Sequence, residues 1–182
     1  MKYDPDKHHR HSIRLPGYDY ASAGMYFVTI CTQNWEALFG HIVDGAIQLN
    51  EAGQMVQAAW EALPEQFPHI EMDEFVVMPN HFHAILVITQ HPGAEKNGVP
   101  RRAIPRLGDM VGAFKSITTD QYIQGVRNKG WPAFDRRVWQ RNLWEHIIRS
   151  EAALAEIREY IRNNPASWEK DQFHPNAPRG QM

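Results

Sequence analysis

Two histidines, His81 and His83, lie on either side of a phenylalanine in the segment MPNHFHAIL, residues 78–86. If this segment is a strand, both imidazoles point to one face of it and Phe82 points to the other. Two neutral imidazoles about 6–7 Å apart on one face can bind the same divalent cation. Histidines hydrogen-bonded in a core, or partly exposed to solvent, would show the same spacing, so the pattern alone leaves all three interpretations open.

A two-histidine metal site needs a third ligand, and the strand that carries the histidines offers no aspartate or glutamate beside them. Two imidazoles favour Mn²⁺, Co²⁺ or Zn²⁺, whereas oxygen ligands suit Mg²⁺ or Mn²⁺. The chain has one cysteine, Cys31, which excludes an internal disulfide and argues against a structural zinc site. A single cysteine in an apolar run suits a reducing cytosol and is expected to be a small buried residue.

A tyrosine near the C-terminus, Tyr160 in the segment REYIRNNP, has a residue type that could form a covalent intermediate. Asn164 follows it by four residues, so on a helix the phenol and the carboxamide emerge on the same face. A tyrosine can attack a phosphate when a metal ion polarises the electrophile and cations such as Arg158 and Arg162 surround it. A boundary position of the apolar stripe is the alternative for Tyr160. The proline after Asn164 disfavours helical geometry there, which leaves Asn163 as the substitute.

Basic residues are concentrated in the middle of the chain. The whole chain has a formal net charge of −2, but residues 96–141 hold ten Lys and Arg against three acidic residues, a charge of +7. Such a segment suggests a surface that faces a polyanion such as nucleic acid. A loop kept soluble by its charge is the alternative interpretation.

Apolar periodicity and turn residues predict the elements that would position these groups. Strands are expected over residues 24–33, on both sides of a turn at 78–80, and over 138–149. Helices are expected over 50–67, 106–126 and 151–164. Asp44-Gly45 lies between alternating apolar positions and predicts a two-residue hairpin.

Apart from the small hairpin, the order is βαββαβ followed by a C-terminal helix. This order predicts an α+β fold with a ferredoxin-like (split βαβ) antiparallel sheet and helices on one face. We expect one domain over residues 1–182, with a basic N-terminal arm at 1–20 and a C-terminal tail at 169–182 that is either loosely ordered or folded over the active site. The N-terminus has no apolar signal segment, and no apolar run approaches the length that crosses a bilayer, so a cytoplasmic protein is expected.

Four segments together resemble the REP-associated tyrosine transposases, relatives of the single-tyrosine transposases of small bacterial insertion sequences. They are SIRLPGYDYASAGMYFVTICTQN, FVVMPNHFHAIL, WEHIIRSE and YIRNNP, and the resemblance runs over residues 12–168. It implies the HUH endonuclease fold and metal-dependent chemistry on single-stranded DNA. His81 and His83 would bind Mg²⁺ or Mn²⁺, with Asn164 as a third ligand. Tyr160 would be the nucleophile that gives a 5′-phosphotyrosine and a free 3′-OH beside a hairpin formed by a palindromic repeat.

The basic segment and arm supply the residues expected to contact DNA: Arg10, Arg14, Arg101, Arg102, Lys115, Arg136 and Arg137. Trp131, Phe134 and Trp139 could stack on unpaired bases or belong to the core. The resemblance allows either a monomer or a homodimer with exchanged helices, nucleoid-associated when bound to DNA. Two other functions stay open at this point. One is a ferredoxin-like nucleic-acid binding module without catalysis, and the other is a metal hydrolase that uses the histidines but not the tyrosine.

Overall fold

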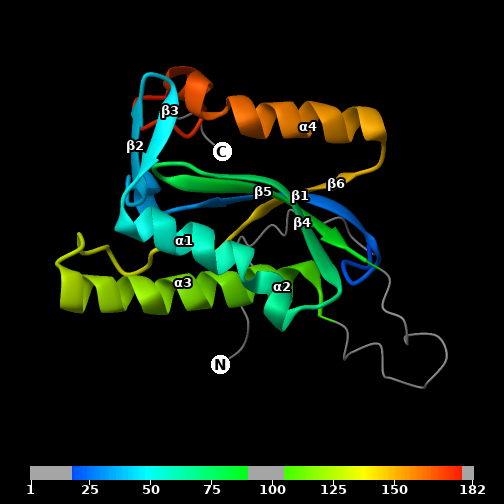
Figure 1. Cartoon of the computed structure of the whole chain (residues 1–182), viewed down its shortest axis with the longest axis horizontal. Coiled ribbons are helices and arrows are strands. Elements are labelled where there is room, and N and C mark those ends of the chain that lie inside the picture. Colours follow the sequence, from blue (N-terminus) through cyan, green and yellow to red (C-terminus); the bar gives the residue numbers. More distant parts are fainter. Residues whose placement is uncertain (1–17, 90–104, 178–182) are drawn as a thin grey trace, which may run out of the picture.

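A computed structural model describes residues 18–89 and 105–177 of the chain. Its centre is a four-stranded antiparallel sheet with the spatial order β4-β5-β1-β6 (Figure 1). The strands are β1 (Gly24–Cys31), β4 (Ile70–Val77), β5 (His81–Ile88) and β6 (Trp144–Ile148). This order confirms the predicted ferredoxin-like arrangement.

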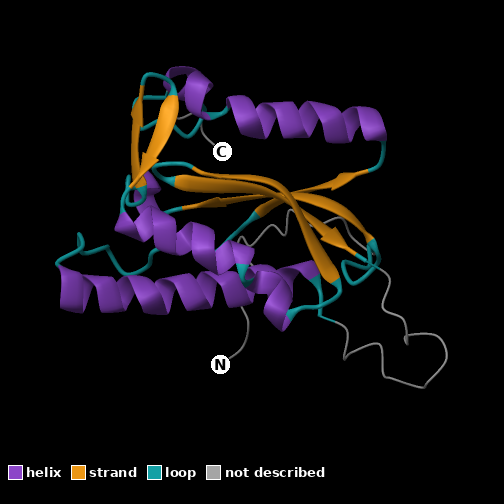
Figure 2. Cartoon of the chain, viewed as in Figure 1, coloured by secondary structure: helices purple, strands orange, loops and turns teal. Residues whose placement is uncertain are grey.

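Helices cover both faces of this sheet, which gives three layers (Figure 2). The helices α1 (Glu51–Glu61) and α3 (Leu107–Lys129) pack on one face, and α4 (Glu151–Asn163) packs on the other (Figure 1). A short helix, α2 (Leu63–Gln66), follows α1 after a bend. The helix that carries Tyr160 therefore packs on the sheet face opposite α1 and α3.

Alternate side chains of β5 pack against the helices on opposite faces of the sheet. Phe82 packs against Trp60 and Phe114 in the core under α1 and α3, with ring centroids 4.9 and 5.2 Å away. Ile85, on the opposite face, belongs to a second apolar cluster with residues of α4. His83 also faces α4, so the predicted division of the histidines and Phe82 between the two faces is confirmed.

A separate two-stranded sheet is formed by β2 (Gly40–Val43) and β3 (Ala46–Leu49). Asp44 and Gly45 between them have φ values of 50° and 73°, the left-handed pair of a type I′ hairpin turn. Side chains cap the N-termini of α1 and α4. The Asn50 side chain accepts from the Gly53 N–H at 2.9 Å, and Ser150 Oγ accepts from the Ala153 N–H at 3.1 Å.

The last strand is shorter than the one predicted over 138–149. Trp139 is 4% exposed and lies against Phe114 in the core, bridged to the sheet only at Thr32. The carbonyls of Gln140 and Asn142 accept from the Lys115 ammonium, so they do not pair with a strand. The chain therefore forms an irregular segment before β6. No helix in the described ranges is long and apolar enough to cross a membrane.

Candidate active site

The two histidines lie at the start of β5 on the face covered by α4. His81 is fully buried, His83 is 1% exposed, and their ring centroids are 4.6 Å apart. From α4, Tyr160 places its hydroxyl 3.2 Å from His83 Nε2. Asn164, at the C-cap of the same helix, places Oδ1 3.3 Å from His81 Nε2. Two side chains one helical turn apart therefore meet one histidine each, within a single chain.

The proline that follows Asn164 does not displace it from the site. Asn164 keeps helical dihedrals, φ −58° and ψ −45°, and the proline starts the next short helix, η3 (Pro165–Lys170). Asn164 is 2% exposed, whereas Asn163 is exposed to solvent. Asn163, the alternative to Asn164 as a metal ligand, thus lies outside the site.

Tyr160 is not a core residue, because 42% of it is exposed. Its ring lies edge-on to Phe27 and to His83, with centroid distances of 6.0 and 5.2 Å. Burial of the hydroxyl, aided by the charge of Asp171, raises the pKa of Tyr160 to about 12. The phenol is therefore protonated at neutral pH and able to donate to His83 Nε2.

Asp171 is a site residue that the sequence did not indicate. Its Oδ2 accepts from Asn164 Nδ2 at 3.0 Å and lies 3.9 Å from His81 Nε2, while its Oδ1 accepts from the Phe173 N–H at 2.7 Å. The ligand atoms of His81, His83 and Asp171 all lie within 4.8 Å of one another. The carboxylate comes from the segment after η3, which has no periodicity that could have signalled its position.

Asn80 determines which nitrogen of His81 faces this cluster. The Asn80 Nδ2 donates to the carbonyls of Trp35 and Phe173, at 3.2 and 2.8 Å, which can only accept. Its Oδ1 is therefore the atom 2.8 Å from His81 Nδ1, so Nδ1 carries the proton. The Nε2 of neutral His81 then presents its lone pair to Asn164 and Asp171.

Two hydrogen-bond acceptors, Asn164 Oδ1 and His81 Nε2, consequently face each other. Asn164 Nδ2 donates to the carboxylate, so Asn164 Oδ1 faces the lone pair of His81 Nε2 without a proton between them. A cation would relieve this contact. A proton is not the resident cation at neutral pH, because burial lowers the pKa of His81 to about 4. Burial, with the neighbouring His81, also holds the pKa of His83 well below its ordinary value. Neutral imidazoles, an amide oxygen and a carboxylate are a donor set that fits a divalent metal ion.

The segment after η3 covers the histidines. The Phe173 ring centroid lies 4.8 Å from that of His81 and 5.9 Å from that of His83. Trp168 of η3 also stacks on His81, with ring centroids 5.9 Å apart. Of the two alternatives expected for the tail, Asp171 and Phe173 agree with the one in which the tail folds over the site.

Two ion pairs tie the tyrosine helix to β4. Arg158 Nε donates to Asp73 Oδ1 at 2.8 Å, its second nitrogen contacts Asp73 Oδ2, and Arg162 pairs with Glu74 at 2.7 Å. The sequence suggests these arginines as cations around a phosphate. The structure pairs both with acids, so they orient α4 and with it Tyr160.

The residues expected to bind DNA are only partly placed. Arg10, Arg14, Arg101 and Arg102 lie outside the described residues. Arg136 and Arg137 lie beside two surface hollows, whereas the Lys115 ammonium donates to the carbonyls of Gln140 and Asn142 at 2.9 and 3.1 Å. Burial lowers the pKa of Lys115 to about 8. Lys115 thus lies beneath the loop that carries the arginines.

The aromatic residues of the basic segment are mostly packed. Trp139 is buried in the core, and Trp131 and Phe134 pack against Tyr122. Cys31 is buried as expected, and desolvation raises its pKa to about 12.

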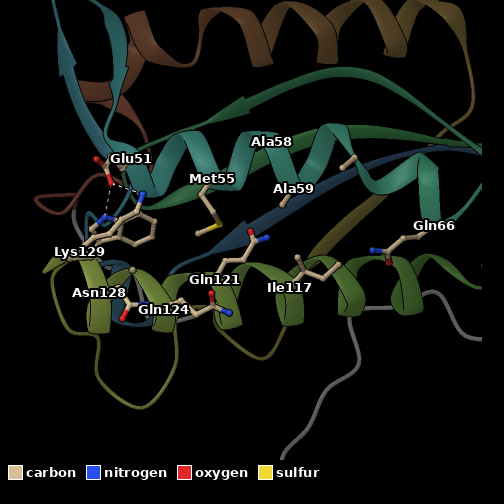
Figure 3. Close-up of a pocket in the computed structure, with 13 residues that line it drawn as sticks. Glu51, Met55, Ala58, Ala59, Gln66, Ile117, Gln121, Gln124, Asn128 and Lys129 are labelled. Carbon is tan, nitrogen blue, oxygen red and sulfur yellow. Dashed lines mark hydrogen bonds and ion pairs between the residues drawn. The ribbon is translucent and has the colours of Figure 1, made fainter.

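Another hollow, of about 570 Å³, lies between α1 and α3 in the layer on the far side of the sheet (Figure 3). Its lining is apolar and carboxamide, with the Glu51–Lys129 ion pair at one end (3.1 Å). The titratable cluster on the α4 face is therefore the better candidate for catalysis.

Comparison with known proteins identifies two relatives of this chain by sequence. No protein-family model matches the chain. A Haemophilus influenzae "Uncharacterized protein" is 43% identical over 182 residues, covering 95% of this chain and 97% of that protein. A second protein of the same organism, named "Putative REP-associated tyrosine transposase", is 26% identical over 168 residues, covering 86% and 83% of the two chains.

A solved structure of a REP-associated tyrosine transposase bound to a REP hairpin superposes with a TM-score of 0.51 at 20% identity. The match covers 85% of this chain and 74% of that one, and at this identity it establishes the fold. In sequence this chain is similar to a protein named a putative REP-associated tyrosine transposase, and its fold matches that of a solved REP-associated tyrosine transposase.

Proposed function

We propose that this protein is a metal-dependent single-stranded DNA endonuclease and strand transferase, a transposase that cleaves beside a hairpin through a 5′-phosphotyrosine. The observation that carries the proposal is the meeting of Tyr160 with His83 at 3.2 Å, beside the cluster of His81, Asn164 and Asp171. A metal hydrolase without a covalent step would not need a half-exposed phenol at this position. A binding module would need neither the phenol nor buried neutral histidines.

In this mechanism the Tyr160 oxygen forms a bond to phosphorus while the bond from phosphorus to the 3′ oxygen breaks. The phenolic proton leaves and the 3′ oxygen gains a proton, so the step is balanced and proton-neutral. The phosphotyrosine conserves the phosphoester bond, and attack by a 3′-OH on it restores DNA without ATP. Phe27 and His83 hold the phenol in place, and the two ion pairs of α4 keep the helix on the sheet.

His81, His83 and Asp171, with the amide oxygen of Asn164, would hold the ion, Mg²⁺ or Mn²⁺. When bound there, the ion would supply Lewis-acid stabilisation of charge on the scissile phosphate. Asn80 and Thr29 prepare the site, because each bonds the Nδ1 of one histidine, at 2.8 and 2.7 Å.

The expected substrate is DNA with a hairpin, the partner described for the structural neighbour. We further propose that cleavage occurs within one chain, because Tyr160 and both histidines come from the same chain, and that the protein acts in the cytoplasm on nucleoid DNA. Among the described residues expected to contact DNA, Arg136 and Arg137 line both surface hollows, and the half-exposed Lys115 lines one of them.

The test is incubation of the protein with Mn²⁺ and a hairpin oligonucleotide that carries a labelled single-stranded flank. A covalent protein–DNA adduct on a denaturing gel, mapped to Tyr160 by mass spectrometry and lost in Tyr160→Phe, is the expected result. Tyr18→Phe is the matched control, because it removes a phenol hydroxyl that hydrogen-bonds to Tyr26 and is not part of the candidate active site.

Each other outcome selects a different function. DNA binding without cleavage would favour the binding module. Cleavage that persists in Tyr160→Phe would favour the tyrosine-independent hydrolase.

A further inference from the structure

A basic hollow lies beside the candidate active site, and the mechanism above does not use it. Its volume is about 470 Å³, and it lies between the short helix η1 (Gln33–Trp35) and residues 136–142. Residues that line this arginine cleft include Gln33, Trp35, Arg136, Arg137, Arg141 and Asn142. Three of them are guanidinium groups, one is an indole, two are carboxamides, and none is acidic.

The walls of the arginine cleft are hydrogen-bonded to the end of β1, next to His81. The Thr32 N–H donates to the carbonyl of Asn80 at 2.9 Å, and Gln140 donates to the carbonyls of Cys31 and Thr32 at 2.9 and 3.0 Å. Cys31 is the register partner of His81 in the sheet. Gln33, which lines the arginine cleft, thus lies two residues beyond the register partner of a candidate metal ligand.

Trp35 is held in an unusual conformation at the wall of the arginine cleft. Its φ of 54° lies in the left-handed region, which is unfavourable for a bulky residue, and Asn34 before it has φ 57°. The Asn80 Nδ2, whose amide also orients His81, donates to the Trp35 carbonyl at 3.2 Å. One buried amide therefore joins the backbone of Trp35, at the wall of the arginine cleft, to the histidine of the active site.

The arginine cleft continues into a second hollow of about 470 Å³. The two hollows share Arg136, Arg137 and Arg141, and the second one reaches Thr119 and Ile123 on α3. The three arginines therefore form a ridge between adjacent hollows, a shape that suits a chain of nucleotides better than one isolated phosphate.

We propose that the arginine cleft binds unpaired nucleotides of the DNA strand that leads into the cleaved phosphate. The arginines contact the phosphates, and Trp35 stacks on a base, which requires a free base face that a duplex does not offer. The carboxamides of Gln33 and Asn142 can hydrogen-bond base edges. This inference rests on the proposed function, since it assumes single-stranded DNA as the substrate.

The test compares two ligands, a blunt hairpin and the same hairpin with an unpaired flank, by fluorescence anisotropy with Tyr160→Phe protein. We expect Arg137→Ala and Arg141→Ala each to weaken binding of the flanked hairpin by about threefold to tenfold. Each should also lower the slope of log K against log salt by about 0.7. Trp35→Ala should cost about tenfold and Trp35→Phe much less, because phenylalanine still stacks. Binding of the blunt hairpin should not change.

The matched control is Arg127→Ala, which removes an exposed charge from α3 outside both hollows. A 5-iodouracil in the flank should cross-link to Trp35. The inference would be overturned if Arg127→Ala weakened binding as much as the cleft variants, or if the cleft variants weakened binding of the blunt hairpin as much as that of the flanked one. Wild-type affinity in the Arg137, Arg141 and Trp35 variants would also overturn it. If the wild-type protein still formed the covalent adduct, any of these three results would leave the proposed function intact. Absence of the adduct, with the flank effect present, would overturn the function and keep the binding site.

Discussion

Replacement of Asn80 by alanine tests whether this amide prepares His81 for a metal ion. The substitution removes three side-chain hydrogen bonds, to the carbonyls of Trp35 and Phe173 and to His81 Nδ1. Each contributes about 1 kcal/mol, and the two buried carbonyls lose their donors, so we expect a loss of roughly 2–4 kcal/mol in the free energy of unfolding. For a chain of this size that lowers Tm by roughly 5–15 °C and leaves the protein folded at 25 °C.

The metal affinity gives the sharper readout. Loss of a residue that orients a metal-binding histidine typically costs about 10–100-fold in affinity. We therefore expect Asn80→Ala to weaken Mn²⁺ binding by that factor in calorimetry at 25 °C. Asn80→Asp keeps an oxygen toward His81 Nδ1 but loses the two amide donors, so it should lose stability while retaining most of the affinity. Asn163→Ala, an exposed amide on the same end of α4, is the control.

Imidazole ¹⁵N spectra separate orientation from general damage to the fold. In the wild-type protein His81 should be the neutral form protonated at Nδ1, and in Asn80→Ala the two tautomers should mix. Mn²⁺ affinity within twofold of the wild type, together with an unchanged His81 tautomer, would refute the reasoning.

Four further predictions concern the groups around the site. Asp171→Asn should weaken Mn²⁺ binding by about tenfold or more in calorimetry with little change in Tm, because it keeps the size but removes the charge from the cluster; an unchanged affinity would exclude Asp171 as a ligand. Arg158→Ala should slow adduct formation by about tenfold or more, since α4 is no longer held on β4. The Arg158 guanidinium lowers the pKa of Asp73, so this pair stabilises the fold above pH of about 3.9 and the contribution is lost as pH falls through the lowered pKa. Asp73→Asn should accordingly flatten the acid limb of a Tm-against-pH curve, and an unaltered limb would contradict this. Phe173→Ala should raise the rate of Mn²⁺ binding in stopped flow, because that ring covers both imidazoles; an unchanged rate would mean that the ion enters by another route.

Local patterns in the sequence were sufficient for the parts of the site that depend on the period of one element. The two-residue spacing of His81 and His83 fixed their common face once the strand began after Pro79-Asn80. The four-residue spacing of Tyr160 and Asn164 placed them one helical turn apart. Each pair is now found facing the other across the α4–β5 interface.

Features that depend on tertiary contacts could not be predicted in this way. Asp171 reaches the histidines because η3 and the residues after it turn back over the sheet, and nothing periodic marks that turn. Charge predicted Lys115 as a DNA contact, and nothing in the sequence indicated that its ammonium also donates to loop carbonyls. Residue type left Trp139 as either a stacking or a core residue, and only the structure shows that its indole donates to the buried Thr118 hydroxyl at 2.8 Å. Residue type indicates what a side chain can do, whereas the neighbours determine whether it is available.

The short connection before α4 favours a site built from one chain. β6 ends at Ile148 and α4 begins at Glu151, with Ser150 as its N-cap, so only two residues join the strand to the tyrosine helix. Exchange of α4 between two copies would have to extend this link and lose the capped turn. It would also have to break the Arg158–Asp73 and Arg162–Glu74 pairs before forming them again with a partner. The folded-back helix already makes those pairs and brings Tyr160 to His83. The same feature that orients the nucleophile therefore also opposes its exchange, which is the physical basis for the proposed cleavage within one chain.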